Sequence, residues 1–86
     1  MKGRIYIEYR RLRFFAVETE DMDFSVIEVQ SGLPFLGDEL IGELNSIGEN
    51  QLYNETTKEE LDVFIHSTHL TFVEAKRYIK DAVRGK

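Results

Sequence analysis

The sequence predicts an α+β fold, in which a three-stranded antiparallel meander over residues 4–30 is followed by three helices packed on the sheet, in the order βββααα. Two observations lead to this prediction. Apolar residues alternate with polar ones before residue 30, as in half-buried strands, whereas beyond residue 38 they recur at three- and four-residue spacing, as in helices. Eighty-six residues suffice for one hydrophobic core, so we expect residues 1–86 to form a single domain.

The first two strands are predicted on either side of a pair of arginines. In the first strand Ile5, Ile7 and Tyr9 are expected to share one face, with polar residues on the other. The segment "RFFAVET" alternates in the same way and predicts the second strand. No glycine or proline separates them, so the chain either makes a tight hairpin at Arg10-Arg11 or continues as one long strand with a bulge there.

The segment "FSVIEVQ" predicts the third strand, after an acidic turn. "SGLPFLG" ends this strand, because Gly32, Pro34 and Gly37 lie close together and regular structure rarely tolerates them. One apolar face of the sheet must then be covered, and we expect the helices to cover it.

Three helices are predicted in the rest of the chain. The first runs over residues 38–48, with an aspartate at its N-cap and a glycine placed to end it. The second occupies "TTKEELDVFIHS", where Thr57 and Glu60 have the spacing of a capping box. The third occupies "LTFVEAKRYIKDAV", where Thr71 and Glu74 repeat that spacing and Phe72 is expected on the inward face.

Composition and motifs argue against several function classes. The chain contains no cysteine, which excludes a disulfide framework, a thiolate zinc site and a thiol nucleophile. The N-terminus has no uninterrupted apolar run of the kind found in signal peptides and membrane anchors, so we expect a soluble, cytoplasmic protein. The glycines form no phosphate-binding loop and no carboxylate pair stands out, so we predict a non-enzymatic protein that uses no cofactor.

Two histidines near the C-terminus raise the question of a metal site. Asp62, His66 and His69 would share one face of a continuous helix, with a spacing that suits Zn²⁺ or Ni²⁺. Thr71, however, is predicted to cap the next helix, so the preceding helix ends near Ser67 and its two histidines lose their common face. The sequence indicates no fourth ligand, and we therefore predict no metal site.

Charge is distributed in three blocks, with a net charge of −5. Both ends of the chain are basic, whereas residues 18–62 contain thirteen acids and one base, Lys58. An acidic segment of this kind can complement a basic partner protein. Leu33 and Phe35 offer an apolar anchor rimmed by acids, although they could equally plug the core. We predict a regulatory protein that binds another protein, with candidate site residues Glu20, Asp21, Asp23, Leu33, Phe35, Asp38, Glu39 and Glu43.

The basic ends support an alternative, a nucleic-acid-binding module. The predicted hairpin interleaves arginines with aromatic residues on which bases can stack, and the last two helices have the outline of a helix-turn-helix. The overall acidity and the absence of glycine from the turn between those helices oppose this alternative. Its candidate residues are Arg4, Tyr6, Arg10, Arg11, Arg13, Arg77, Lys80 and Arg84. We expect no membrane partner, and a three-stranded sheet with exposed edges would allow a homodimer.

Overall fold

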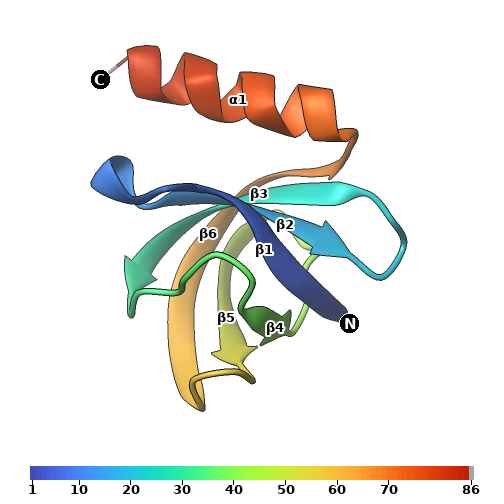
Figure 1. Ribbon diagram of the computed structural model, residues 1–86, viewed down its shortest axis with the longest axis vertical. Coiled ribbons are helices and arrows are strands. Elements are labelled where there is room, and N and C mark those ends of the chain that lie inside the picture. The colour runs from blue at the N-terminus through green and yellow to red at the C-terminus, as the bar shows by residue number, and fades with distance from the viewer. Residues whose placement is uncertain (86) are drawn as a thin grey trace.

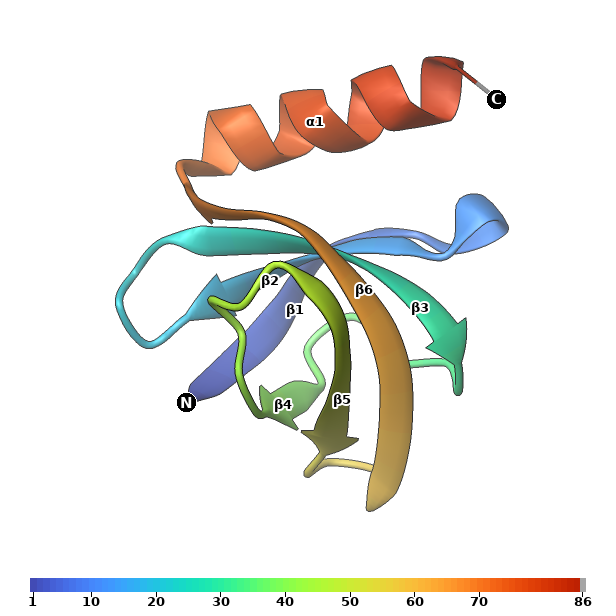
Figure 2. The same ribbon diagram turned by 180° about the vertical axis from the view of Figure 1, so that it is seen from behind.

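The computed structural model of the protein describes residues 1–85 and shows a closed antiparallel barrel with one helix lying outside it (Figure 1). The elements in chain order are β1 (Lys2–Tyr9), the 3₁₀ turn η1 (Arg10–Leu12), β2 (Phe14–Thr19), β3 (Phe24–Ser31), β4 (Glu39–Ile41), β5 (Gly48–Asn54), β6 (Glu59–Leu70) and α1 (Phe72–Arg84). Around the barrel the strand order is β1-β2-β3-β6-β5-β4, and β4 pairs with β1 to close it. Seen from behind, the turn between β5 and β6 lies at the end of the barrel away from α1 (Figure 2).

The predicted α+β fold with three helices is wrong beyond residue 38. The N-terminal meander is confirmed, because β1, β2 and β3 pair in sequence as antiparallel neighbours. The arginine pair lies in η1, which makes the hairpin turn between β1 and β2. The helix predicted over residues 38–48 is instead β4 and the loop that follows it, and the helix predicted over residues 56–67 is a turn and most of β6. Within residues 1–85 only the last of the three predicted helices forms.

β6 shows why a helical pattern misled the prediction. Leu61, Val63 and Ile65 alternate along this strand and enter the barrel interior. Because Phe64 between them is also apolar, the same segment satisfies the three- and four-residue spacing of a helix. β6 pairs with β3 on one side and β5 on the other, so its backbone hydrogen bonds are made between strands. Pairing with β3 and β5 therefore overrides the local preference.

The backbone conformation at two glycines shows that residues 38–48 do not form a helix. Gly42 has φ of 153° and Gly48 has φ of 113°, values that favour glycine and lie far from helical backbone. A Cβ atom on Gly42 would also lie 2.6 Å from the side chain of Leu52. Between these glycines Leu44 enters the barrel, and its carbonyl accepts a hydrogen bond from Ser25 Oγ at 2.7 Å. This loop therefore closes one part of the barrel interior.

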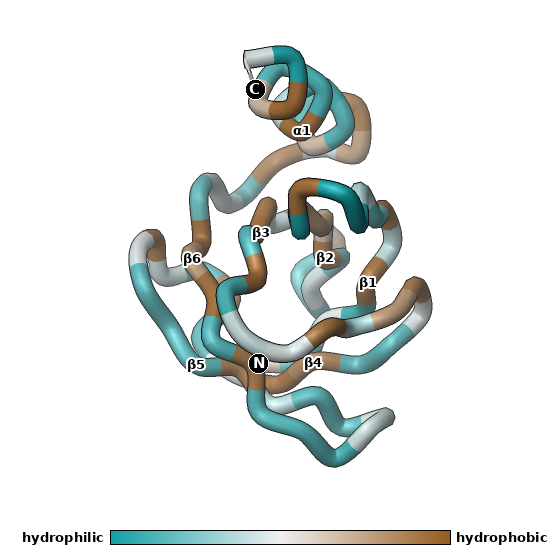
Figure 3. Tube along the Cα trace, turned by 90° about the vertical axis from the view of Figure 1, so that its left-hand side faces the viewer, coloured by the Kyte–Doolittle hydropathy of each residue, from teal (hydrophilic) through white to brown (hydrophobic). Residues whose placement is uncertain are grey.

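The protein has two hydrophobic cores. We call the barrel interior the barrel core; its side chains are Ile5, Phe15, Val17, Ile27, Val29, Leu40, Leu44, Leu52, Leu61, Val63 and Ile65. We call the layer between the barrel wall and α1 the helix core; its buried side chains are Phe14, Ala16, Phe24, Val26, Ala75 and Ile79. Figure 3 shows α1 end-on, as a separate layer outside the strands. β2 and β3 supply alternate residues to the two cores. Each of these two strands is therefore buried on both of its faces.

A β-bulge at Tyr6 lets β1 contribute to both cores. The register of β1 against β2 shifts between Ile5 and Ile7, so Tyr6 is an extra residue in the strand. Before the bulge Ile5 enters the barrel core, and after it Ile7 and Tyr9 pack against the helix core. The prediction that Ile5, Ile7 and Tyr9 share one face is therefore wrong, because the bulge reverses the alternation of side chains.

α1 begins at the capping box predicted from Thr71 and Glu74. Thr71 Oγ1 accepts a hydrogen bond from the Glu74 backbone N–H at 3.2 Å, and Glu74 Oε1 accepts one from the Thr71 N–H at 2.9 Å. Ala75 and Ile79, one turn apart, are buried against the barrel. No helix within residues 1–85 has the length and apolar character needed to cross a membrane.

Closure of the barrel affects the expected homodimer, which is predicted from exposed edges of a three-stranded sheet. The two outer strands of the meander are paired, β1 with β4 over Lys2–Arg4 and β3 with β6. Next to β1 the loop before β4 continues the contact, because the Ile5 N–H donates to the Asp38 carbonyl at 2.9 Å. Dimerisation stays a prediction, but these edges are occupied within the chain.

Candidate functional site

The acidic residues predicted to bind a protein lie at several places on the barrel. Glu20 and Asp21 are exposed in the turn between β2 and β3, and Glu43 is exposed in the loop after β4. Glu39 forms a salt bridge with Arg4, with 3.1 Å between Oε2 and the guanidinium nitrogen. Glu20 and Glu39 line one shallow depression together with Glu18, whereas Glu43 lies outside it. The structure therefore brings only some of these carboxylates together, and their role in binding stays a prediction.

Asp38 is buried in a hydrogen-bonded network rather than placed at a helix N-cap. Its Oδ2 accepts hydrogen bonds from Asn54 Nδ2 at 2.8 Å and from the Phe35 N–H at 2.9 Å. Asn54 Oδ1 accepts two further bonds from the N–H groups of Thr56 and Thr57, at 3.0 and 3.2 Å. The network ties the loop before β4 to the turn between β5 and β6, and its buried polar groups are satisfied.

The loop between β3 and β4 separates the two apolar residues that the sequence grouped together. Leu33 is half-buried and packs against the barrel core. Phe35 is exposed, and the Arg10 guanidinium carbon lies 4.5 Å from the centre of its ring. One side chain thus supports the core while the other stays at the surface.

Arg10 and Arg13 of the β1–β2 hairpin are held by backbone carbonyls of β3 and the loop after it. Arg13, which has φ of 62°, donates from Nε to the Val29 carbonyl at 2.8 Å and from its terminal nitrogen to the Gly32 carbonyl. Arg10 donates to the Pro34 carbonyl at 3.2 Å. These side chains therefore fix the end of β3 and the loop after it, and part of their hydrogen-bonding capacity is occupied within the protein.

The basic residues of α1 are exposed to solvent. Within residues 1–85 none of them forms a salt bridge; they are Lys76, Arg77, Lys80 and Arg84. Arg11 lies near the C-terminal end of α1, because it lines a small cavity together with Val83. Of the N-terminal arginines, Arg11 thus adjoins α1, whereas Arg4, Arg10 and Arg13 contact Glu39, the Pro34 carbonyl and the Val29 carbonyl.

The two histidines contact different carboxylates. His66 Nε2 lies 2.9 Å from Glu28 Oε1, and its Nδ1 lies 3.4 Å from the Tyr78 hydroxyl. His69 Nδ1 lies 2.9 Å from Asp23 Oδ2. No group of three or more His, Asp or Glu side chains in the described part of the chain is arranged to hold a metal ion. His66 instead links β3, β6 and α1 by hydrogen bonds.

Asp23 has a pKa below its ordinary value. The main cause is a hydrogen bond from the Thr19 hydroxyl, at 2.5 Å from Asp23 Oδ1, which stabilises the charged carboxylate. Partial burial acts in the opposite direction, and the contact with His69 lowers the pKa of Asp23 further. This carboxylate therefore stabilises the turn between β2 and β3 while it is ionised.

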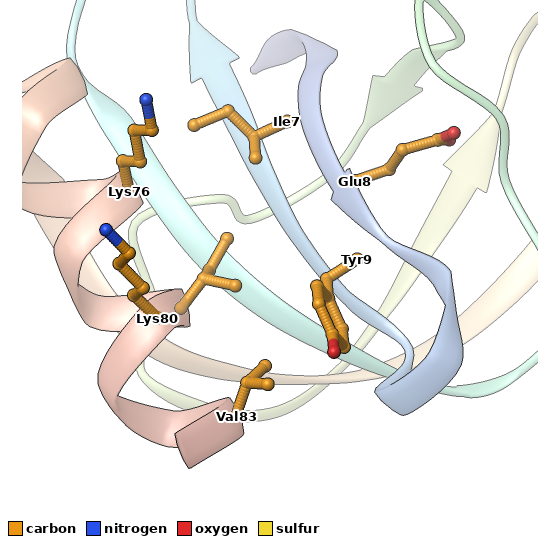
Figure 4. Close-up of a pocket in the computed structure, with 7 residues that line it drawn as sticks. Ile7, Glu8, Tyr9, Lys76, Lys80 and Val83 are labelled. Atoms are coloured by element: carbon orange, nitrogen blue, oxygen red, sulfur yellow. The ribbon is translucent and has the colours of Figure 1, made fainter.

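A groove with a mainly apolar lining runs between β1 and α1 (Figure 4). Ile7 and Tyr9 from β1 form one side, and Ile79 and Val83 from α1 form the other. Its volume is about 190 Å³. The groove exists because the bulge directs the end of β1 toward the helix layer, while α1 packs mainly on β2, β3 and β6.

Positive charge borders this groove. Lys76 and Lys80 lie one turn apart on the flank of α1 that faces β1 (Figure 4). Glu8 also lines the groove, but its carboxylate is directed away from the helix (Figure 4). Glu8 Oε2 accepts a hydrogen bond from the Leu36 N–H at 3.1 Å and lies 3.7 Å from the Arg10 guanidinium. The groove therefore combines apolar walls with a basic rim.

Large apolar side chains are exposed at the N-terminal end of α1. Tyr6 is 54% exposed, Phe72 41% and Val73 60%. The rings of Tyr6 and Phe72 pack edge to face at 5.9 Å, and both contact the buried ring of Phe24 at 5.7 Å. The expected inward position of Phe72 is thus only partly correct. We call the whole region the helix-strand surface; it comprises Tyr6, Ile7, Tyr9, Phe72, Val73, Lys76, Ile79, Lys80 and Val83.

Sequence reasoning found part of this surface. The nucleic-acid alternative includes Tyr6 and Lys80, whereas the sequence assigns Ile7 and Val83 to packing and gives Val73 no role in binding. An apolar stripe on α1 wider than its buried contact is the available signal, since Val83 extends it to the lysine flank, while Val73 lies among the basic residues.

No protein-family model matches this chain, and no curated protein or solved structure is significantly similar to it. Its class follows from its own residues: a small closed antiparallel barrel, one helix packed on its wall, and a mixed apolar and basic surface where the two meet.

Proposed function

We propose that the protein acts by binding another protein through the helix-strand surface, without catalysing a reaction. The observation that carries this proposal is the exposure of Tyr6, Phe72 and Val73 beside an apolar groove. Aromatic side chains are enriched at protein interfaces, and contiguous exposed apolar residues rimmed by polar groups mark such sites. A cytoplasmic location is part of the same proposal.

The chemistry of the groove supports binding rather than catalysis. Four of its lining residues are apolar, and the carboxylate of Glu8 is already engaged by the Leu36 N–H and Arg10. General acid-base catalysis needs a proton donor or acceptor within hydrogen-bonding reach of a substrate. The two lysines at the rim are exposed, which suits them to hold a charged partner.

Nucleic-acid binding is the second candidate function. The observation that favours it is the basic flank of α1 next to exposed rings, since single-stranded nucleic acids bind positive grooves in which bases stack on aromatic side chains. Against it stand the net charge of −5 and the internal use of Arg4, Arg10 and Arg13.

Site-specific photo-cross-linking tests the proposal in the cells that express the protein. A benzoylphenylalanine replaces Tyr6 in one variant and Tyr53 in a matched control, because both are exposed tyrosines on strands but Tyr53 lies on β5 outside the helix-strand surface. We expect discrete protein adducts at position 6 and none at position 53. Equal adducts at both positions, or none at position 6, would refute the proposal, and adducts sensitive to nuclease would establish the second candidate.

A further inference from the structure

We infer that the groove between β1 and α1 binds an acidic segment of a partner protein, which inserts one large apolar side chain between Ile7 and Val83. This inference rests on the proposed function and adds the chemistry of the partner. It follows from the size of the groove, its lining and the charges around it.

The size of the groove suits a single side chain. Its volume of about 190 Å³ lies below the roughly 300–1,000 Å³ of pockets that hold small-molecule ligands. It is somewhat larger than a dry apolar cavity of roughly 150 Å³ that accepts benzene. A phenylalanine or leucine side chain therefore fits this space.

The walls of the groove are preformed by regular structure. Ile7 and Tyr9 belong to β1 after the bulge, and Ile79 is fixed by its burial in the helix core. Sites formed by strands and helices need little rearrangement to accept a ligand, so less of the binding free energy is lost in ordering them. An apolar side chain that enters here also covers the half-buried surfaces of Ile7 and Val83.

The charges around the groove select an acidic segment. Lys76 and Lys80 stand at its rim, and Arg77 lies next to them in a shallow depression that also includes Val73. In the part of the chain that the structure describes, none of these cations forms a salt bridge. Carboxylates on either side of the inserted residue can therefore form charge-assisted hydrogen bonds with them.

The acidity of the rest of the protein should orient the approach of an acidic partner. The chain carries 16 acidic residues against 11 basic ones, and four of the basic residues lie on α1. An acidic partner is repelled by most of the barrel and attracted at the helix, so its approach is oriented toward the groove.

The lining favours a peptide over a nucleic acid. Three of the four apolar lining residues, Ile7, Ile79 and Val83, are aliphatic and one, Tyr9, is aromatic, whereas bases stack on flat aromatic or guanidinium faces. A nucleic acid would contact the basic flank through phosphates and leave the apolar groove empty. An acidic peptide with one apolar anchor uses both features.

Fluorescence anisotropy tests this inference with defined probes. The probe is a fluorescein-labelled peptide with three Asp or Glu residues on each side of one Phe, measured at about 50 mM salt, where charge attraction is weakly screened. Matched probes carry Ser in place of Phe, or Lys in place of the acids, and a labelled oligothymidine represents single-stranded DNA. We expect that, of these four probes, only the acidic Phe peptide binds. Its affinity should fall when the salt concentration is raised.

Two protein variants place the peptide in the groove. The double change Lys76→Glu and Lys80→Glu should weaken binding by about tenfold or more, because it replaces attraction with repulsion at the rim. Lys58→Glu is the matched control, since this exposed lysine lies in the turn at the opposite end of the barrel, and it should change affinity less than about twofold. Val83→Phe fills the groove and should abolish the Phe dependence while the melting temperature is retained.

The outcomes separate the inference from the proposed function. Equal affinity for the Ser and Phe peptides, or binding unaffected by Val83→Phe in a folded variant, would overturn insertion into the groove. Binding of oligothymidine without binding of the acidic peptide would overturn the assigned partner chemistry. If position 6 forms protein adducts in cells while no acidic peptide binds, the inference fails and protein binding stands. If no adduct forms there, the proposed function itself fails.

Discussion

The barrel core and the helix core are built from alternate residues of the same strands, yet their boundaries differ. Phe15 and Val17 point into a space closed on all sides by strands, whereas Phe14 and Ala16 point outward to a single helix. One helix cannot cover the whole outer face of β1, β2 and β3, so the helix core has an open margin along β1. Interior positions therefore set the stability of the fold, and margin positions form the surface that we propose to bind a partner.

The largest expected effect comes from Phe15→Ala in the barrel core. Removal of this fully buried ring should lower the free energy of unfolding by about 3–5 kcal/mol, because the closed wall of strands cannot collapse into the cavity. Urea unfolding followed by circular dichroism measures the loss. Tyr53→Ala on the outer surface is the control, and a loss below about 1 kcal/mol for Phe15→Ala would contradict the closed core.

A smaller effect is expected from Ile79→Ala in the helix core. We expect a loss of about 2 kcal/mol, at the low end for such truncations, because one side of this site is open and can relax. Hydrogen exchange should show that α1 loses protection while β6 keeps it, since the barrel core is intact. Lys80→Ala controls for a change on the same helix, and equal loss of protection in β6 would show that the two cores are not separate units.

The smallest expected effect concerns Asp23, in the turn beyond both cores. Its pKa is lowered below 3.8, so its ionised form stabilises the folded protein. That contribution is complete above the pKa of the unfolded chain and is lost as pH falls through the lower pKa of the folded protein. The stability difference between the wild type and Asp23→Asn should therefore be constant near neutral pH and shrink at acidic pH. A difference independent of pH down to pH 2 would contradict this role.

The parts of the fold that sequence predicted are those with local causes. The first three strands follow one another as neighbours, and the capping box at Thr71 lies within one turn of α1. β6 depends in part on β3, a strand far along the chain, and its Leu61, Phe64 and Ile65 have helical spacing, whereas Leu61, Val63 and Ile65 have the alternation of a strand. The alternation of Leu61, Val63 and Ile65 was the stronger signal, because β-branched residues favour strands.

The candidate site could be predicted only in part for the same reason. The basic side chains of α1 are visible in the sequence, as is the aromatic residue Tyr6. The groove depends on the bulge at Tyr6 and on the position of α1 over its neighbouring strands, and neither has a local signature. Ile7 therefore looked like a partner of Ile5 until the bulge placed them in different cores.

The position of β6 in the chain has a consequence for biosynthesis. β6 lies between β3 and β5 and closes the barrel, but the ribosome makes it after every other strand. A nascent chain that ends at residue 58 therefore holds two strands whose edges lack their final neighbour. Such unpaired edges invite pairing between molecules, so we expect the chain to be prone to aggregation until β6 emerges. Completion of this one strand removes both edges at once.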